Sequence, residues 1–331
     1  MREALIAICA AITLFYLISA KRAGKQRLRA LPADKERVML IGCSSGIGRD
    51  LALKYAARGA KLALFARRQA LIDSLRQECE QAGSTNVVTI AGDITQTSDL
   101  ERLVEATKRT LDGVDTVVFC AGLISVRPFM DASGIKVVHS QQSPSSGHFS
   151  VKLLQDTSSS SSSTTTSIDE ALEHITDVNY MAPVRLCRLV LPMLIETSVA
   201  PNIMIMSSLA GKVGAPTRAL YAGSKHALHG FFDSLRVEVE RYNVHIGIIC
   251  PGTVDTELRN SAVDIGKGDG QAIAGSTRGK LSSSAVARRT LDASDRRERE
   301  VFIPALFGYV AIWAKLLASR WVDWAAKKKY S

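Results

Sequence analysis

This 331-residue sequence has no paired cysteine spacing. Its six cysteines show neither a CxxC motif nor a regular separation from histidine; they are Cys9, Cys43, Cys79, Cys120, Cys187 and Cys250. Several stand inside apolar runs, where a free cysteine behaves as a small hydrophobic side chain. The pattern therefore excludes a disulfide framework, predicts no metal site and suits a reducing compartment.

The middle of the chain also has little net charge. The formal charge of the whole chain is +10, but residues 1–30 carry +5 and residues 315–331 carry +4, which leaves +1 for residues 31–314. No basic stripe with interleaved aromatic residues crosses the middle, so we expect no nucleic-acid partner. Positive charge at two ends, each beside an apolar stretch, favours positioning at a membrane.

The N-terminal stretch from Ala4 to Ala20 holds 17 residues without a charge, at the short limit for crossing a bilayer. Five basic residues follow it at once: Lys21, Arg22, Lys25, Arg27 and Arg29. The positive-inside tendency then predicts a cytosolic domain. A cleaved signal peptide is the alternative, but Ile18 stands where a cleavage site needs a small residue. We therefore expect residues 1–30 to form an uncleaved membrane anchor with a basic flank.

The C-terminal stretch, residues 305–331, is apolar and contains all three tryptophans, followed by a basic tail. On one helix the tryptophans would lie within about 80° of one another. Such a face suits a membrane interface, or packs on the domain or on a second copy in a homodimer, and the sequence leaves these open. Lys328 and Lys329 resemble the dilysine signal of endoplasmic reticulum membrane proteins. That signal acts on the cytosolic side, which agrees with the N-terminal topology.

Between these ends, apolar runs alternate with stretches of helical character. We expect strands at 37–42, 62–66, 87–91, 116–120, 202–206 and 244–250, and helices near 47–58, 69–81, 98–111, 181–197 and 221–241. This alternation of almost wholly apolar strands with helices predicts a parallel sheet covered on both faces. The expected fold class is therefore α/β, a doubly wound parallel sheet (Rossmann fold), as a single domain over residues 31–304.

One interruption breaks the alternation, at about residues 131–167. It ends in eleven consecutive serines and threonines, 157–167. Such a run buries too little apolar surface to offset the entropy of ordering it. The interruption is therefore expected to be a disordered surface insertion.

A glycine-rich turn joins the first strand to the first helix. Glycines there let the backbone approach a pyrophosphate, and the helix N-terminus favours negative charge. The predicted cofactor contacts in this turn are Gly42, Ser44, Ser45, Gly46, Ile47 and Gly48. The second strand ends at Arg67-Arg68, and no acid stands between Leu62 and Asp73 to bind a ribose 2′-hydroxyl. Arginine accommodates a 2′-phosphate, so the expected cofactor is NADP(H).

Tyr221 and Lys225 stand one helical turn apart and share a helix face. A nearby cation favours the phenolate, so we expect Lys225 to bring the pKa of Tyr221 down toward working pH for acid–base catalysis. Ser208 follows the fifth strand at the carboxyl edge of the sheet, where ligands bind in such folds.

These motifs together resemble the short-chain dehydrogenase/reductase family over roughly residues 36–305. The matching segments are GCSSGIG, SSLAGKVGAPTRALYAGSK, DVNYMAPV and CPGTVDTEL. The apolar ends and the SSLAGKVGAP stretch are similar to the microsomal 11β-hydroxysteroid-dehydrogenase-like branch. The resemblance implies a catalytic set with Tyr221 as acid/base, Lys225 on the nicotinamide ribose, Ser208 on the substrate carbonyl and Asn179 holding a relay water.

The resemblance also implies cofactor contacts beyond the first turn. Asp93 would contact the adenine, and the nicotinamide side would be lined by Pro251, Gly252, Val254 and Thr256. Three positions depart from the family pattern, since Ile41 replaces a threonine and Phe119-Cys120 replaces two asparagines. Ala121 and Gly122 keep the close backbone approach to the cofactor.

The expected function is an NADP-dependent oxidoreductase acting on a hydrophobic ketone or secondary alcohol, such as a steroid, retinoid or lipid carbonyl. A 3-ketosphinganine reductase is the alternative enzyme, although the PGTVDTEL turn leans toward the hydroxysteroid-like branch. A catalytically inactive membrane scaffold is the alternative from another class. The expected location is the endoplasmic reticulum membrane, with the catalytic domain facing the cytosol.

Overall fold

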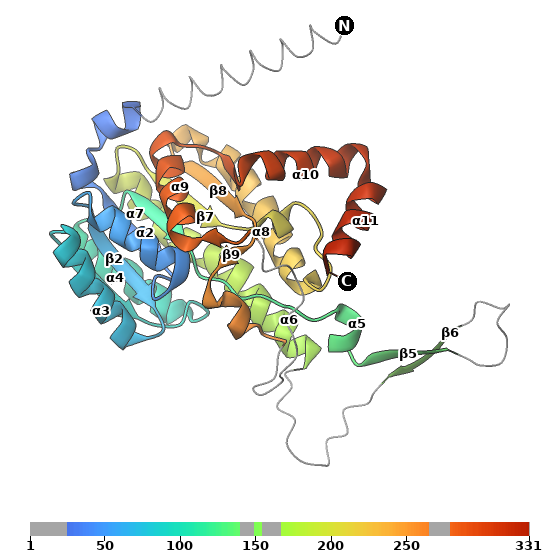
Figure 1. Ribbon diagram of the computed structural model, residues 1–331. Helices are drawn as coiled ribbons and strands as arrows, with labels where there is room; N and C mark the ends of the chain where they lie inside the picture. The colour runs from blue at the N-terminus through green and yellow to red at the C-terminus, as the bar shows by residue number, and fades with distance from the viewer. Residues whose placement is uncertain (1–24, 140–148, 154–166, 265–278, 331) are drawn as a thin grey trace, which may run out of the picture.

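The computed structural model of the chain describes residues 25–139, 149–153, 167–264 and 279–330. Within them lies a sheet of seven parallel strands with helices on both faces (Figure 1). The strands run in the spatial order β11-β8-β7-β4-β1-β2-β3. Their bounds are β1 Arg37–Ile41, β2 Lys61–Ala66, β3 Val87–Ala91, β4 Thr116–Phe119, β7 Asn202–Met206, β8 His245–Pro251 and β11 Glu300–Ile303.

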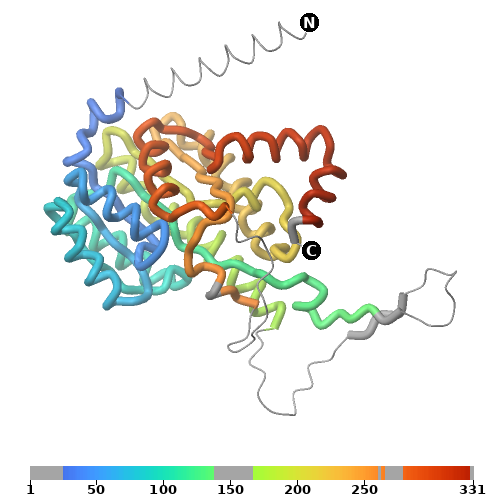
Figure 2. The backbone as a smooth tube through the Cα atoms, viewed as in Figure 1, coloured from blue at the N-terminus to red at the C-terminus, as the bar shows by residue number. Residues whose placement is uncertain are grey.

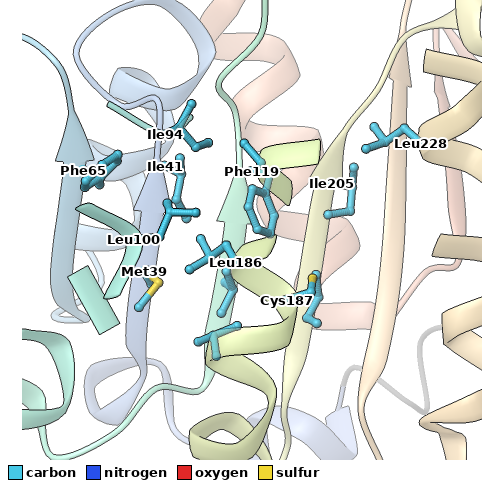
Figure 3. Close-up of a cluster of buried hydrophobic side chains, with 14 of the residues drawn as sticks. Met39, Ile41, Phe65, Ile94, Leu100, Phe119, Leu186, Cys187, Ile205 and Leu228 are labelled. Carbon is cyan, nitrogen blue, oxygen red and sulfur yellow. The ribbon is translucent and has the colours of Figure 1, made fainter. Parts of the chain in front are cut away.

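Helices cover each face because successive strand residues point to opposite sides. In β1, Met39 and Ile41 pack in one hydrophobic cluster, and Val38 and Leu40 pack in the other. The first face carries α4 (Thr97–Leu111), α7 (Ala182–Thr197) and α8 (Ala219–Glu238), and the second carries α2 (Gly46–Ala56), α3 (Gln69–Ala82) and α9 (Ser283–Arg296). Figure 3 shows strand and helix side chains meeting in the first cluster.

The predicted α/β doubly wound sheet is confirmed, and each of the six expected strands and five expected helices is present near its expected bounds. Sequence reasoning missed α6 (Ile168–Thr176), α9 and β11. A π-helical turn, η2 (Asp177–Met181), joins α6 to α7 and carries Asn179. β11 extends the sheet beside β8, with Glu300 opposite Ile248 and Ile303 opposite Pro251.

Part of the predicted insertion, residues 131–167, has regular secondary structure. After α5 (Phe129–Ala132), strands β5 (Ile135–His139) and β6 (Phe149–Leu153) form an antiparallel pair that projects away from the sheet (Figure 1). Local antiparallel pairing satisfies backbone hydrogen bonds without needing a core. Residues 140–148 and 154–166, which hold most of the Ser/Thr run, lie outside the described residues. Ser167 ends that run and caps α6 in a capping box with Glu170.

The apolar C-terminus is helical as expected, but it forms two helices. α10 (Ala305–Leu317) and α11 (Ser319–Tyr330) meet at an angle, because the backbone of Ala318 leaves the helical conformation (Figures 1 and 2). The tryptophans therefore do not share one helix face: Trp313 lies on α10, whereas Trp321 and Trp324 lie on α11. All three side chains are more than half exposed.

Arg27, one residue of the expected basic flank, is buried in the domain. It belongs to a short helical segment, residues 25–30, and is only 3% exposed. Its guanidinium donates to Glu36 at 2.7 Å and to the Thr116 hydroxyl at 2.8 Å, and Arg58 pairs with the same Glu36. Arg27 therefore ties the start of the described chain to the amino edge of the sheet.

The predicted membrane span at Ala4–Ala20 lies outside the described residues. Within them, one helical run, residues 168–197, is long enough to cross a bilayer, and its most apolar stretch of 18 residues has a mean hydropathy of 1.3. Half of that stretch is buried inside the fold, and the run comprises α6, η2 and α7. We therefore assign it as a core helix of the domain.

Candidate active site

The predicted site residues gather at the carboxyl edge of the sheet around a cavity of about 1170 Å³. The chain proceeds from β1 to β2 and β3 on one side and from β4 to β7, β8 and β11 on the other, so the switch point lies between β1 and β4. Doubly wound sheets bind ligands at this point. Every predicted cofactor contact lines the cavity, as do Ser208, Tyr221 and Lys225. Asn179 is not on its wall and lies behind it.

The glycine-rich turn packs closely against the end of β4. Gly42 has a φ of 80°, and a Cβ placed there would lie 2.4 Å from the backbone nitrogen of Ala121. A Cβ at Gly48 would lie 2.3 Å from the Gly42 carbonyl oxygen. Only glycine fits at these two positions. The N-terminus of α2, which begins at Gly46, consequently opens toward the cavity with its backbone N–H groups.

Two arginines follow β2 beside this turn. Arg68 donates from Nη2 to the hydroxyl of Ser44 at 3.0 Å, and Ser45 lies 3.5 Å from the same nitrogen. Arg67 is exposed and lines the cavity. Asp73, the first acid after β2, is occupied elsewhere because it accepts hydrogen bonds from Gln69 and Thr89. The arginines and serines together form a cationic, hydroxyl-rich corner that suits a phosphate.

Tyr221 and Lys225 rise from α8 beside the end of β7. Tyr221 is 7% exposed, and its phenol interacts with the side chain of Ser208. Lys225 Nζ donates to the Met206 carbonyl oxygen at 3.0 Å and lies 5.8 Å from the centre of the Tyr221 ring. The structure thus brings together the phenol, hydroxyl and ammonium groups that sequence reasoning selected.

The pKa of Tyr221 differs from the sequence-based expectation. Burial raises it above the ordinary value, although the hydrogen bond with Ser208 and the charge of Arg218 lower it. Burial also brings the pKa of Lys225 itself down, to about 8. In the protein alone, removal of the phenol from water therefore outweighs the nearby charges.

Asn179 is fully buried in the π-helical turn. Its Oδ1 accepts from the Leu123 backbone N–H at 2.8 Å, and its Nδ2 donates to the Leu123 carbonyl and the Ser224 hydroxyl, both at 2.9 Å. Both amide hydrogens are therefore used within the protein. The side chain fixes the loop after β4, and the relay water stays a prediction.

The other predicted contacts complete the cavity wall. Asp93 accepts hydrogen bonds from the backbone and hydroxyl of Thr95, both at 2.9 Å, which shapes the turn after β3. On the far side, the Gly252 N–H donates to the Ile303 carbonyl at 2.8 Å. The segment from Pro251 to Thr256 is thereby held along the carboxyl ends of β8 and β11.

Sequence reasoning missed several residues that hold these parts together. The Ser125 hydroxyl accepts from the Tyr221 backbone N–H at 3.2 Å. Asp264 is buried and accepts from the backbone N–H groups of Val126 and Arg127 at 2.8 Å, which ties the segment after Thr256 to the loop after β4. His229 lies beneath Ser207, and no motif marked it. These contacts join residues far apart in the chain, so no local pattern identifies them.

The fold and this arrangement define an oxidoreductase of the short-chain dehydrogenase type. Residues 36–143 and 157–265 match the short chain dehydrogenase family, and the chain belongs to that family. It is 28% identical over 299 residues to 11-beta-hydroxysteroid dehydrogenase 1A of Arabidopsis thaliana, covering 88% of this chain and 75% of the relative. It is 27% identical over 310 residues to dehydrogenase/reductase SDR family member 7B of Mus musculus, covering 89% and 84%. The resemblance inferred from the motifs is confirmed.

Solved structures agree on the fold. A short-chain dehydrogenase/reductase from Burkholderia phymatum in complex with NAD superposes with a TM-score of 0.64 at 19% identity, covering 85% of this chain and 91% of that chain. An alcohol dehydrogenase from Thermococcus sibiricus, complexed with 5-hydroxy-NADP, gives 0.61 at 19% identity, covering 81% and 95%.

Proposed function

We propose that this protein is an NADP(H)-dependent oxidoreductase that interconverts a hydrophobic ketone and its secondary alcohol, such as a steroid, retinoid or lipid carbonyl. The observation that carries the proposal is that Tyr221 and Ser208 stand together on the wall of a large cavity at the switch point, where the two side chains interact. Tyr221, the proposed proton donor, and Ser208, whose hydroxyl would polarise the carbonyl, lie at the edge of the sheet where a dinucleotide binds in this fold.

The residues present fit a nicotinamide dinucleotide. Gly42 and Gly48 have no side chain and pack closely against neighbouring backbone. The turn can therefore present its backbone to the pyrophosphate. Arg67 and Arg68 offer charge to a 2′-phosphate, and Asp73 is turned away, which supports NADP(H) over NAD(H). The cofactor, when bound, supplies the hydride.

The chain's own groups handle the proton. Tyr221 delivers a proton to the carbonyl oxygen during reduction, while the Ser208 hydroxyl donates a hydrogen bond to the same oxygen. Lys225, held by the Met206 carbonyl, binds the nicotinamide ribose and supplies positive charge beside the phenol. Asn179 keeps the loop after β4 in place through its two hydrogen bonds with the Leu123 backbone.

The substrate side of the cavity supports a hydrophobic substrate. Two helices of the C-terminus contribute apolar residues to its wall, among them Phe307, Val310 and Ala314 of α10 and Trp321 and Val322 of α11. A polar substrate would lose its hydration against this wall without regaining hydrogen bonds.

The outer side of the same helices supports membrane association. Large apolar side chains are exposed there, including Leu306, Trp313, Leu317 and Trp324. Apolar and tryptophan side chains flanked by basic residues suit the interfacial region of a bilayer. Together with the expected anchor in residues 1–30, this supports our proposal that the enzyme works at the endoplasmic reticulum membrane with residues 31–304 in the cytosol.

The function is tested by following NADPH and NADH consumption with a panel of steroid, retinoid and lipid ketones that includes 3-ketosphinganine. We expect turnover of at least one hydrophobic ketone with NADPH and much slower turnover with NADH. Preference for 3-ketosphinganine would select the alternative enzyme. No turnover, with intact dinucleotide binding, would favour the scaffold.

The orientation is tested by adding protease to intact microsomes. A cytosolic domain is digested without detergent, and the expected first cuts fall in the Ser/Thr run at 157–167. Protection of the domain until detergent is added would place it in the lumen and leave the Lys328-Lys329 pair without a role.

A further inference from the structure

A buried histidine that the proposed chemistry does not use lies directly beneath the catalytic serine turn. His229 stands on α8 one helical turn after Lys225 and is 4% exposed. Its Nε2 lies 3.0 Å from the hydroxyl of Ser207, the residue before Ser208. Lys225 in turn donates to the Met206 carbonyl. α8 therefore holds the end of β7 at two successive residues through two side chains one turn apart.

The turn after Ser208 closes over the imidazole ring. A Cβ at Gly211 would lie 2.8 Å from Cδ2 of His229 and 3.0 Å from the Ser207 hydroxyl oxygen. Ser208 also accepts a hydrogen bond from the Ala210 N–H at 3.2 Å inside this turn. The ring is thus enclosed between the helix and the segment that presents Ser208.

The surroundings of the two ring nitrogens favour one tautomer. Nδ1 lies 3.5 Å from Oε1 of Glu300 without forming a hydrogen bond to it. Because a carboxylate only accepts, this neighbour favours the ring proton on Nδ1, which leaves Nε2 as the acceptor for the Ser207 hydroxyl. Burial, together with the charge of Lys212, lowers the pKa of His229 to about 3, so the ring is neutral at physiological pH.

The same ring belongs to a group of three side chains with metal-ligand chemistry. Cys250 Sγ lies 3.6 Å from Nε2, and the ligand atoms of His229, Cys250 and Glu300 fall within 4.8 Å of one another. However, the Lys212 ammonium lies 2.6 Å from Glu300 and already compensates its charge. A divalent cation there would meet like charge, so the contacts favour hydrogen bonding over metal binding.

We propose that His229 is a positioning residue for the catalytic serine. As a neutral acceptor it fixes the Ser207 hydroxyl, and through that residue it sets the backbone that aims Ser208 at Tyr221 and the substrate carbonyl. The inference rests on the proposed function, because it needs Ser208 to act on a carbonyl. A catalytic group misplaced by about 1 Å can lower the rate by about a hundredfold. Loss of the His229 contact should therefore lower kcat measurably.

The test compares His229→Leu with His229→Gln, using His226→Leu as the control on the same helix. His229→Leu removes the acceptor and should lower kcat by about tenfold to a hundredfold, with KM for the ketone and Kd for NADPH changed by less than about threefold. His229→Gln keeps an amide oxygen within reach of Ser207 and should recover most of kcat. Ser207→Ala should resemble His229→Leu, and the double variant should be no worse than either single variant.

A readout independent of turnover keeps the two proposals separable. Long-range proton–nitrogen NMR of the ¹⁵N-histidine-labelled protein should show His229 with a bare Nε2 and a protonated Nδ1. If the parent protein shows no turnover, the proposed function is overturned. The NMR measurement of the His229 tautomer does not depend on turnover, so it tests the His229–Ser207 contact separately. Equal kcat for the Leu and Gln variants, a protonated Nε2, or stoichiometric zinc in the purified protein would each overturn the inference about His229.

Discussion

At the scale of single residues, Tyr221 shows burial and hydrogen bonding acting in opposite directions on one group. Burial raises the pKa of the phenol, while Ser208 and Arg218 lower it. Because the net direction is upward, the phenol is protonated at neutral pH before the cofactor binds. A protonated phenol is the form that reduction of a carbonyl consumes.

The first prediction is that Tyr221→Phe lowers kcat for ketone reduction by about 10²–10⁴-fold, the range typical of lost acid–base catalysis. Phenylalanine keeps the size and packing of the ring, so Kd for NADPH should change little. Tyr242→Phe, on an exposed tyrosine outside the cavity, is the matched control. Steady-state kinetics decide the matter, and near-parental turnover by the Tyr221 variant would refute the catalytic assignment.

The second prediction concerns Arg67 beside the glycine-rich turn. Arg67→Asp should weaken NADPH binding by roughly tenfold to a hundredfold, because a hydrogen bond to a charged group contributes about 1.5–3 kcal/mol. NADH binding should change far less. Arg76→Asp on α3 is the control, since Arg76 pairs with Glu80 on the exposed side of that helix. Fluorescence titration measures both dissociation constants, and equal losses for both cofactors would mean that Arg67 is only a surface charge.

At the scale of elements, apolar runs and turn glycines were sufficient to locate the central strands and most of the helices. They did not locate β11, whose four residues include a charged one and which is defined by pairing with β8. α9 was missed because most of its side chains are polar or charged and its few buried residues face α2. Candidate site residues inside motifs, such as Tyr221, could be selected from the sequence because the residues of a motif lie close together in the chain.

Residues defined by distant partners escaped sequence reasoning. Arg27 looked like one of several basic residues after a membrane anchor, yet its partner Thr116 stands 89 positions away. His229 and Ser125 are likewise identified only by contacts that the fold creates. The direction of the Tyr221 pKa also needed the structure, because the extent of burial cannot be read from a four-residue spacing.

The third prediction follows from the ion pairs at the amino edge of the sheet. Arg27→Met leaves Glu36 buried with one fewer cation, and loss of one partner of a buried pair costs about 3 kcal/mol of unfolding free energy. Arg29→Met removes the same charge from an exposed position of the same segment and should cost less than about 0.5 kcal/mol. Urea unfolding of the full chain in detergent compares the two. Equal midpoints would show that the Arg27 contact contributes nothing to stability.

At the scale of the whole molecule, the half-buried, neutral His245 links stability to pH. Burial, and then the charge of Arg297, lower the pKa of His245 to about 3, and its Nε2 lies 3.2 Å from the Glu298 carbonyl oxygen. An unfolded histidine titrates near 6.5. Between these values the unfolded chain binds a proton that the folded chain does not. The unfolding free energy therefore falls as pH decreases from about 6.5 toward 3. Well above 6.5, His245 is neutral in both states and adds nothing to the pH dependence of the unfolding free energy.

The fourth prediction is that His245→Gln flattens this dependence. The glutamine amide can still donate to the Glu298 carbonyl, but it takes up no proton when the chain unfolds. Well below pH 6.5, each buried neutral histidine steepens the fall by about 1.4 kcal/mol per pH unit. The variant should therefore lose stability more slowly than the parent between pH 6 and 4, while the shape of both profiles agrees above pH 7. Denaturant unfolding across this range makes the comparison, and parallel profiles at every pH would mean that His245 is already charged in the folded protein or does not change its protonation on unfolding.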